Sequence, residues 1–241
     1  MTALLEARGL SKRFGGLKAV DDLSLAIEEG ELHCLIGPNG AGKSTFFKLV
    51  LGRYAPTSGS VRFRGEDITA LEAAARVRRG MSVKMQVPGV FPELPVRQNL
   101  DIALQYRFKG AELRREVDRL LDLIDLARAA AKPAGQLAHG QKQWLEIAMA
   151  IGVRPNLLLL DEPTAGMSPE ETYKTGEMVK ALNADGMTVL VVEHDMAFVR
   201  QIARKVSVLH FGRMFAQGSI DEITGNEAVQ EIYLGKGHHG H

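Results

Sequence analysis

Short apolar runs alternate with helical patterns along most of the chain. Continuous runs typical of buried strands occupy residues 32–36, 157–160, 188–192 and 206–209. Between them, apolar residues recur at helical spacing. Strands that alternate with helices in this way predict an α/β fold with a mainly parallel sheet.

Three weaker strand patterns near the N-terminus predict a second kind of sheet. They occupy residues 5–8, 23–27 and 60–63, and they follow one another as in an antiparallel meander. We therefore expect an antiparallel β subdomain beside the α/β core.

Helical periodicity dominates between residues 87 and 152. One face of a predicted helix in this region is apolar and the opposite face is charged. The apolar positions are Leu113, Val117, Leu120, Leu121 and Ile124. We expect a single domain over 1–241, in which 1–86 and 153–241 form the core and 87–152 is an inserted α-helical subdomain that begins with a proline-rich segment.

The composition limits the kinds of partner that the chain can have. Thirty Lys and Arg residues against 29 Asp and Glu residues leave a net charge of +1. No bulk electrostatic field would therefore recruit nucleic acid or anionic lipid, and we expect no nucleic-acid partner. The apolar runs are far shorter than a membrane span, so we do not expect the chain to cross a membrane by itself.

Cys34 is the only cysteine of the chain. It cannot form an internal disulfide, and its place inside the first apolar run predicts a buried strand position. This usage favours a reducing cytoplasm, and we do not expect Cys34 to take part in catalysis.

The sequence GPNGAGKS at residues 37–44 is the most specific motif. It follows a predicted strand and precedes a helical run, as a phosphate-binding loop requires. Glycines let backbone N–H groups turn toward phosphate oxygens, Lys43 reaches the β- and γ-phosphates, and the Ser44 hydroxyl binds Mg²⁺. A glycine-rich turn that merely caps a helix is the alternative, which this placement disfavours. The predicted nucleotide-binding residues are Gly37, Pro38, Asn39, Gly40, Ala41, Gly42, Lys43, Ser44 and Thr45.

Polar residues follow other predicted strands and would meet at the same sheet edge. The run at 157–160 ends in Asp161 and Glu162, which suit a water-mediated Mg²⁺ ligand and a group that polarises the attacking water. His194 follows another strand, and Gln86 ends the strand-like stretch SVKMQ. The amide of Gln86 could contact the metal or the water. For His194 and Gln86 an ordinary polar strand end is the alternative.

A second anion-seeking helix start lies at residues 136–144, QLAHGQKQW. It combines a glycine, two glutamines and a lysine ahead of an apolar helical pattern. The phosphate loop at 37–44 lies far earlier in the chain, so what this second helix start binds stays an open question at this point.

Taken together, these motifs resemble the ATP-binding subunit of an ATP-binding cassette (ABC) transporter. GPNGAGKS resembles Walker A, Gln86 the Q-loop, LAHGQKQ the signature motif, LLLLDE Walker B, AGMS the D-loop and His194 the switch histidine. They occur in the family's order over essentially the whole chain. The resemblance implies a P-loop NTPase with a RecA-like core that hydrolyses ATP, with ATP and Mg²⁺ as cofactors.

The resemblance also assigns roles to individual residues. It implies Glu162, His194 and Gln86 as catalytic residues, and Ser44, Gln86 and Asp161 as metal ligands. Phe14 would stack on adenine, with ordinary core packing as the alternative. In the family two cassettes pack head to tail, so the signature residues would close over the nucleotide held by the partner subunit. These residues are Leu137, Ala138, His139, Gly140 and Gln141.

Three positions depart from the family pattern. Ala138 and His139 stand where serine and glycine are usual, so a hydroxyl that would contact the partner's γ-phosphate is missing. Ser168 stands where aspartate is usual in the D-loop, which puts the coupling of the two sites in doubt. None of these departures removes the Walker chemistry.

The family implies transmembrane permease subunits, a second ABC ATPase subunit in a homo- or heterodimer, and a substrate-binding protein as partners. It also implies a peripheral position on the cytoplasmic face of the inner (plasma) membrane. Stretches such as GQKQWLEIAMA and VVEHDMAFVR are most similar to the hydrophobic amino-acid and amide uptake class. Urea, branched-chain amino acids and other small amides or acids all stay open as substrates.

Two other classes of function compete with transport. A soluble ABC-type ATPase acting on ribosomes or nucleic acid usually has two fused cassettes or long coiled-coil insertions, and neither pattern is present. A P-loop kinase needs no signature helix and no switch histidine, and no second-substrate lid is evident.

The segment VPGVFPEL at 87–94 is the expected contact with a permease. It directly follows Gln86 and combines prolines with two apolar residues, Val90 and Phe91, that we expect to be exposed. The alternative is that Phe91 packs inside the helical subdomain.

Overall fold

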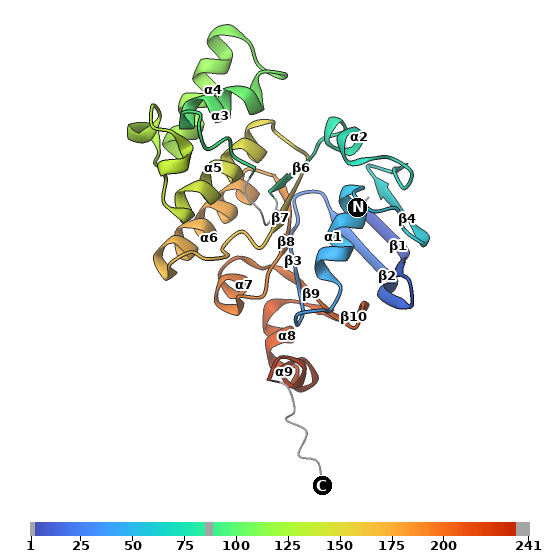
Figure 1. Ribbon diagram of the computed structural model, residues 1–241. Helices are drawn as coiled ribbons and strands as arrows, with labels where there is room; N and C mark the ends of the chain where they lie inside the picture. The colour runs from blue at the N-terminus through green and yellow to red at the C-terminus, as the bar shows by residue number, and fades with distance from the viewer. Residues whose placement is uncertain (1–2, 85–88, 235–241) are drawn as a thin grey trace.

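Two β-sheets form the framework of the protein (Figure 1). The computed structural model describes residues 3–84 and 89–234. The larger sheet has six strands in the order β10-β9-β3-β8-β7-β6. Its strands are β3 (Leu32–Ile36), β6 (Met81–Lys84), β7 (Leu157–Asp161), β8 (Thr188–Val192), β9 (Lys205–His210) and β10 (Arg213–Gly218). All neighbouring pairs are parallel except β9 and β10, which confirms the mainly parallel core.

The smaller sheet is antiparallel and has the order β2-β1-β4-β5. Its strands are β1 (Ala3–Phe14), β2 (Leu17–Glu28), β4 (Ser58–Phe63) and β5 (Glu66–Asp67). Helix α1 (Lys43–Leu51) packs between the two sheets, since Phe46 and Phe47 are fully buried in a cluster that contains residues of both. The antiparallel β subdomain expected from the sequence is therefore present.

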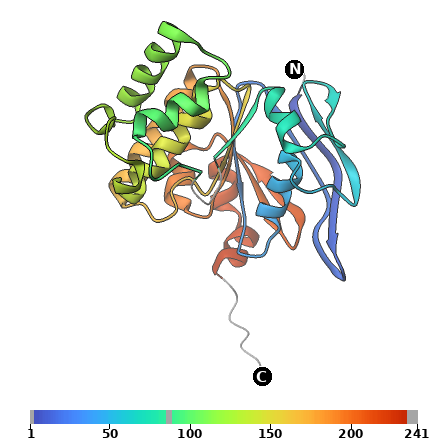
Figure 2. The ribbon, with the colours of Figure 1, turned by 45° about the horizontal axis from the view of Figure 1, so that its top comes forward.

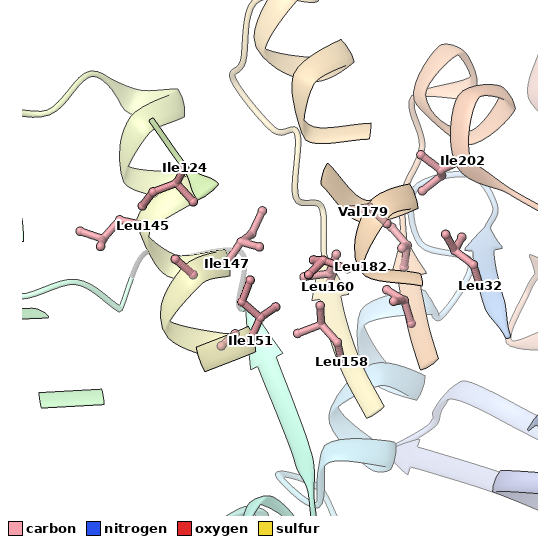
Figure 3. Packing of buried hydrophobic residues seen from close by; sticks show 14 of the residues in the cluster. Leu32, Ile124, Leu145, Ile147, Ile151, Leu158, Leu160, Val179, Leu182 and Ile202 are labelled. Atoms are coloured by element: carbon pink, nitrogen blue, oxygen red, sulfur yellow. The ribbon is translucent and has the colours of Figure 1, made fainter. Parts of the chain in front are cut away.

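Helices cover the opposite face of the large sheet (Figure 2). Those packed nearest to it are α5 (His139–Gly152), α6 (Pro169–Ala184) and α7 (Met196–Ile202). Ile147 and Ile151 of α5 lie beside Leu158 and Leu160 of β7 (Figure 3). Strand β7 is apolar on both faces, and both faces are covered. Helix α1 and its neighbours cover one face, and α5 covers the other.

In the described part of the connection from β6 to β7, the α-helices are α3 (Val96–Leu104), α4 (Gly110–Leu123) and α5. The predicted apolar face of α4 is confirmed, because Val117, Leu120, Leu121 and Ile124 are buried and Leu113 packs against the same cluster. These helices share that cluster with the large sheet. The exact limits of an inserted subdomain at 87–152 stay a prediction.

The remaining helices are short. They are α2 (Ala73–Arg78), α8 (Ile220–Gly225), α9 (Glu227–Leu234) and two 3₁₀ turns, η1 (Ala127–Ala129) and η2 (Ala134–Gln136). Within residues 3–84 and 89–234, no helix has the length and apolar character needed to span a membrane.

Cys34 lies fully buried in the centre of β3, as the sequence predicts. Burial raises the pKa of its thiol, and the negative charge of Glu193 raises it further. The thiolate is therefore scarce at neutral pH, which agrees with a structural strand residue.

Arg76 of α2 fixes the far end of α1. Its fully buried guanidinium donates to the carbonyl oxygens of Leu49 (3.0 Å) and Val50 (2.7 Å) in the last turn of α1. It also donates to the carbonyls of Leu71 (2.9 Å) and Thr69 (3.0 Å). Burial lowers the pKa of Arg76 to about 10, opposed by Asp67, so the side chain is charged at neutral pH. One cation therefore supplies hydrogen-bond donors to carbonyls in the last turn of α1, where few backbone N–H groups are available.

We expect Arg76→Met to lower the free energy of unfolding by about 3 kcal/mol, because several buried carbonyls lose a charged donor at once. Arg76→Lys should recover only part of this loss, since an ammonium cannot reach all of the carbonyls that a planar guanidinium serves. Denaturant unfolding measures both effects. Arg78→Met, at an exposed position of the same helix, is the matched control, and an equal loss in that control would contradict the role of Arg76.

Candidate functional site

The loop between β3 and α1 is shaped by two neighbouring strands. Gly42 has φ of 100°, and a Cβ at this position would collide with the carbonyl oxygen of Ala19 in β2. A Cβ at Gly37 would collide with the carbonyl oxygen of Leu209 in β9. Backbone atoms press on the loop at both ends, so these positions admit only glycine and the loop is held in one shape.

Lys43 is the first residue of α1, and its side chain is turned into the loop. The ammonium donates to the carbonyl oxygens of Gly37 (2.6 Å) and Pro38 (3.1 Å). Burial lowers the pKa of Lys43, while the negative charges of Glu162 and Asp161 act in the opposite direction. A largely buried cation therefore lies between the loop and the carboxylates that follow β7.

A cavity of about 360 Å³ opens over this loop. The residues that line it are Leu17, Lys18, Ala19, Asn39, Gly40, Ala41, Gly42, Lys43, Ser44, Thr45, Glu162 and Phe211. Backbone N–H groups at the start of a nine-residue helix, an ammonium and a hydroxyl are the donors that phosphate oxygens require. The donor set thus fits the phosphates of a nucleotide.

Four of the lining residues were missed by sequence reasoning. Leu17, Lys18 and Ala19 come from the start of β2, and Phe211 comes from the turn between β9 and β10. Long-range pairing brings both segments to the loop, since Gly212 N donates to Ala41 O at 2.9 Å. In the sequence, the only local signal for Phe211 was the stretch HFGR, which is typical of a turn. In the structure, Phe211 lies in this turn with φ of 47° and is 79% exposed.

Asp161 is the last residue of β7 and is 3% exposed. Burial, and to a smaller extent the adjacent charge of Glu162, raise the pKa of its carboxyl to about 6. A divalent cation beside Asp161 would offset the free-energy cost of burying its negative charge. Asp161 and Ser44 both line a second cavity of about 600 Å³, and their role as Mg²⁺ ligands stays a prediction.

Among the described residues, no group of three or more His, Cys, Asp or Glu side chains could hold a metal ion. This agrees with the chemistry of Mg²⁺, which usually takes one or two protein oxygens together with water and substrate phosphates. Ser44 and Asp161 fit that arrangement. Gln86, the third predicted ligand, lies outside the described residues.

Glu162 and His194 are brought together at the edge of the large sheet. Glu162 N donates to Val192 O at 2.9 Å, and His194 Nδ1 lies 3.4 Å from Glu162 Oε1. Glu162 has φ of 45°, a left-handed conformation that is uncommon outside glycine and that marks many active-site residues. Their catalytic roles stay predictions, but their carboxylate and imidazole are close enough to act on one water.

Glu193, next to His194, is a further residue that sequence reasoning missed. Its 1%-exposed carboxylate accepts from Thr164 N (3.2 Å) and Thr164 Oγ1 (2.5 Å) with one oxygen. The other oxygen accepts from His194 N (2.9 Å) and Asp195 N (3.3 Å). Glu193 therefore ties the loop after Glu162 to the segment that carries His194. In the sequence it is only one more polar residue after a strand.

Lys84 at the end of β6 was missed as well. Its buried ammonium donates to the carbonyl oxygens of Glu162 (3.2 Å) and Asp161 (3.4 Å). Burial lowers its pKa, and the negative charges of Glu146 and Asp161 oppose this effect. The backbone that presents the two carboxylates is therefore held from the β6 side as well.

The signature segment is not at the phosphate loop of its own chain. Leu137 is buried in the core, and its N–H donates to Ala134 O at 3.2 Å. Ala138 N donates to Gln141 Oε1 at 3.1 Å, Gly140 is buried, and His139 contacts a backbone carbonyl elsewhere in the chain. Among the described residues that line the cavity over the phosphate loop, none belongs to 137–141.

Phe14 is 43% exposed and lies edge-on to Tyr54, with ring centroids 5.3 Å apart. Lys12 Nζ lies 5.3 Å from the centre of the Phe14 ring. Phe14 is thus neither packed in the core nor among the described residues that line the cavity. Its contact with adenine stays a prediction.

Known proteins match both the sequence and the structure. A family model described as ABC transporter matches residues 20–165. The chain belongs to the ABC transporter family. It is an ATPase and binds nucleotide.

This ABC ATPase is similar to curated relatives over nearly its whole length. It is 37% identical to the high-affinity branched-chain amino acid transport ATP-binding protein BraF of Pseudomonas aeruginosa, over 97% of this chain and 98% of the relative. It is 35% identical to the corresponding protein LivG of Escherichia coli, with the same two coverages. A solved ADP conformation of an ATP-binding cassette of an ABC transporter has a TM-score of 0.87 and 29% identity over 98% of this chain and 100% of that chain.

We expect Glu162→Gln to lower ATP turnover about 10²- to 10⁴-fold while nucleotide affinity stays close to that of the unchanged protein, because an amide cannot accept a proton from water. Single-turnover hydrolysis and nucleotide binding, measured together, test this. Glu170→Gln, at an exposed carboxylate of α6, is the control. Near-normal hydrolysis by Glu162→Gln would remove Glu162 from the role of base.

Proposed function

We propose that this ABC ATPase powers an importer whose solute is a branched-chain amino acid or a small amide or acid of the same uptake class, urea included. The observation that carries the proposal is the 37% identity, over almost the full length of both chains, to a protein named for branched-chain amino acid transport. Relatives named for ribose and methionine import support the importer class, at 33% and 38% identity.

The proposed reaction uses the residues at the edge of the large sheet. Lys43 and the N–H groups of the phosphate loop bind the phosphates, and Phe14 contacts the base. Ser44, Asp161 and Gln86 would hold Mg²⁺, which would neutralise part of the charge of the phosphates. Glu162 accepts a proton from the attacking water. His194, 3.4 Å from Glu162, orients that carboxylate and the γ-phosphate.

A second cassette completes the site in this proposal. The segment 137–141 of each subunit closes over the nucleotide of the other, in a two-fold interface. The position of 137–141 away from the cavity of its own chain supports this arrangement. With Ala138 in place of serine, the N–H groups at the start of α5 carry the contact.

The proposed partners are two permease subunits, a second ABC ATPase subunit and, through the assembled transporter, a substrate-binding protein. The ATPase would lie on the cytoplasmic face of the plasma membrane as a peripheral subunit. The net charge of +1 and the import functions named for the relatives do not favour the alternative of a soluble ATPase that acts on ribosomes or nucleic acid.

The proposed permease contact is centred on Phe91. Its ring is 47% exposed, while its N–H is held by Asn99 Oδ1 at 2.7 Å. Val90 differs from the prediction, because it is partly buried and packs against the main core cluster. Gly89 N donates to the carboxylate of Glu146 on α5, so the segment is tied to the helix that starts with the signature residues.

Reconstitution with the two permease subunits and the binding protein in vesicles tests the proposed function. We expect leucine to stimulate ATP hydrolysis and to accumulate in the vesicles, with urea as the parallel substrate. If urea alone stimulates ATP hydrolysis, the transported solute is urea and not a branched-chain amino acid. Failure to copurify with permease subunits from membranes would contradict the importer assignment.

We expect Phe91→Ala to leave the ATPase rate of the isolated subunit near normal, because Phe91 is not among the described residues that line either cavity at the site. In the reconstituted complex it should abolish most of the solute-stimulated ATPase and uptake, since an exposed apolar contact is lost. Phe215→Ala, at a ring that is 44% exposed on β10, is the matched control. Intact stimulation in a folded Phe91→Ala variant would place the contact elsewhere.

A further inference from the structure

The side chain of His139 contacts a loop of its own chain. Its ring nitrogen Nε2 lies 2.9 Å from the carbonyl oxygen of Ala165. A carbonyl oxygen only accepts hydrogen bonds, so Nε2 carries the proton in the tautomer that makes this contact. Gln143 Nε2, which lies 3.3 Å from the same ring nitrogen, is then not a donor to it. Ala165 belongs to the 162–168 loop, which runs from Glu162 to Ser168 and joins β7 to α6. The first residue of α5 therefore donates to the middle of the loop that begins with the proposed base.

Gly166 shows how closely the imidazole covers this loop. Its φ is +74°, and a Cβ at this position would lie 3.0 Å from His139 Nε2. The left-handed backbone and the ring both exclude a larger residue. His139 thus contacts two consecutive residues of the 162–168 loop.

A second contact joins the same two parts of the chain. Gly140 is buried, and a Cβ there would collide with the carboxylate of Glu171. That carboxylate accepts from Ser168 N at 2.9 Å, and Ser168 Oγ accepts from Glu171 N at 3.3 Å, which caps the start of α6. The first turn of α5 therefore contacts the middle of the 162–168 loop directly and its end through Glu171 of α6.

Glu193 holds the opposite side of the loop. Its carboxylate accepts hydrogen bonds from the backbone N–H and the hydroxyl of Thr164, one residue before Ala165. The loop starts at Glu162 in a left-handed conformation, which persists only where the surroundings enforce it. Two side chains hold the loop in this conformation. One is Glu193, directly after β8, and the other is His139 of α5.

We propose that His139 is a positioning residue that fixes the 162–168 loop, and through it Glu162, to the N-terminal end of α5. The proposal rests on the proposed role of Glu162, and it gives His139 a different task from the one that the sequence predicts. Its side-chain donor is used inside its own subunit and not on the partner's nucleotide. A movement of the start of α5 would then be transmitted to the carboxylate of Glu162 through the hydrogen bond between His139 and Ala165.

Three substitutions at His139 separate the hydrogen bond from the bulk of the ring. Glutamine places an amide N–H at about the distance of Nε2, whereas asparagine is too short and alanine has no donor. In the nucleotide-free protein, we expect hydrogen–deuterium exchange in the 162–168 loop to be about three- to tenfold faster in His139→Ala and His139→Asn. His139→Gln should restore the rate of the unchanged protein.

ATP turnover should follow the same order. We expect kcat to fall about three- to tenfold in His139→Ala and His139→Asn, with KM for ATP little changed, and to recover in His139→Gln. Gly166→Ala should lower kcat less in the His139→Ala background than alone, because only the backbone penalty of Gly166→Ala is then left. Trp144 is the only tryptophan, and its Nε1 donates to Thr175 Oγ1 of α6 at 2.9 Å, so its fluorescence checks that each variant is folded.

The outcomes distinguish this inference from the proposed function. Unchanged loop exchange and kcat in a folded His139→Ala variant would overturn the positioning role. Equal losses in His139→Ala and His139→Gln would overturn it as well, because the effect would not depend on the donor. Normal hydrolysis by Glu162→Gln would instead overturn the proposed role of Glu162, whatever the loop exchange shows for His139.

Discussion

The parallel pairing of β7, β8 and β3 determines where the polar groups of the site lie. Asp161 of β7 and Leu35 of β3 both pair with Val192 of β8. The ladder continues one residue further, since Glu162 N donates to Val192 O and Glu193 N donates to Leu35 O. The loops after these strands therefore leave the sheet at the same level. A slip of one residue in any strand would turn its carboxylate to the opposite face.

This constraint explains why much of the fold could be predicted from the sequence. Continuous apolar runs must be buried on both faces of a sheet, so they identify the central strands without any structure. The phosphate loop could be predicted equally well, because its glycines, lysine and serine all lie within residues 37–44. The limits of β8 agree with the predicted 188–192, and the buried face of α4 follows the predicted spacing.

Side chains that act across long sequence separations could not be predicted in this way. Glu193 and Thr164 are 29 residues apart, and Lys84 is 77 residues from Asp161. Each reads as an ordinary polar residue until the sheet brings its donors or acceptors to it. Ser168 is a related case. It stands where the family usually has aspartate, yet both residues are good N-caps, and Ser168 caps α6 with Glu171 as its reciprocal partner.

The burial of Cys34 has a practical consequence for labelling. It is the only thiol of the chain, it lies fully buried in β3, and burial raises its pKa, so maleimide reagents would react with it slowly in the native state. The native protein thus supplies a nearly silent background for single introduced cysteines. A spin label or fluorophore on an exposed residue of α6 and another on α4 would report how the helices move relative to each other without first removing a native cysteine.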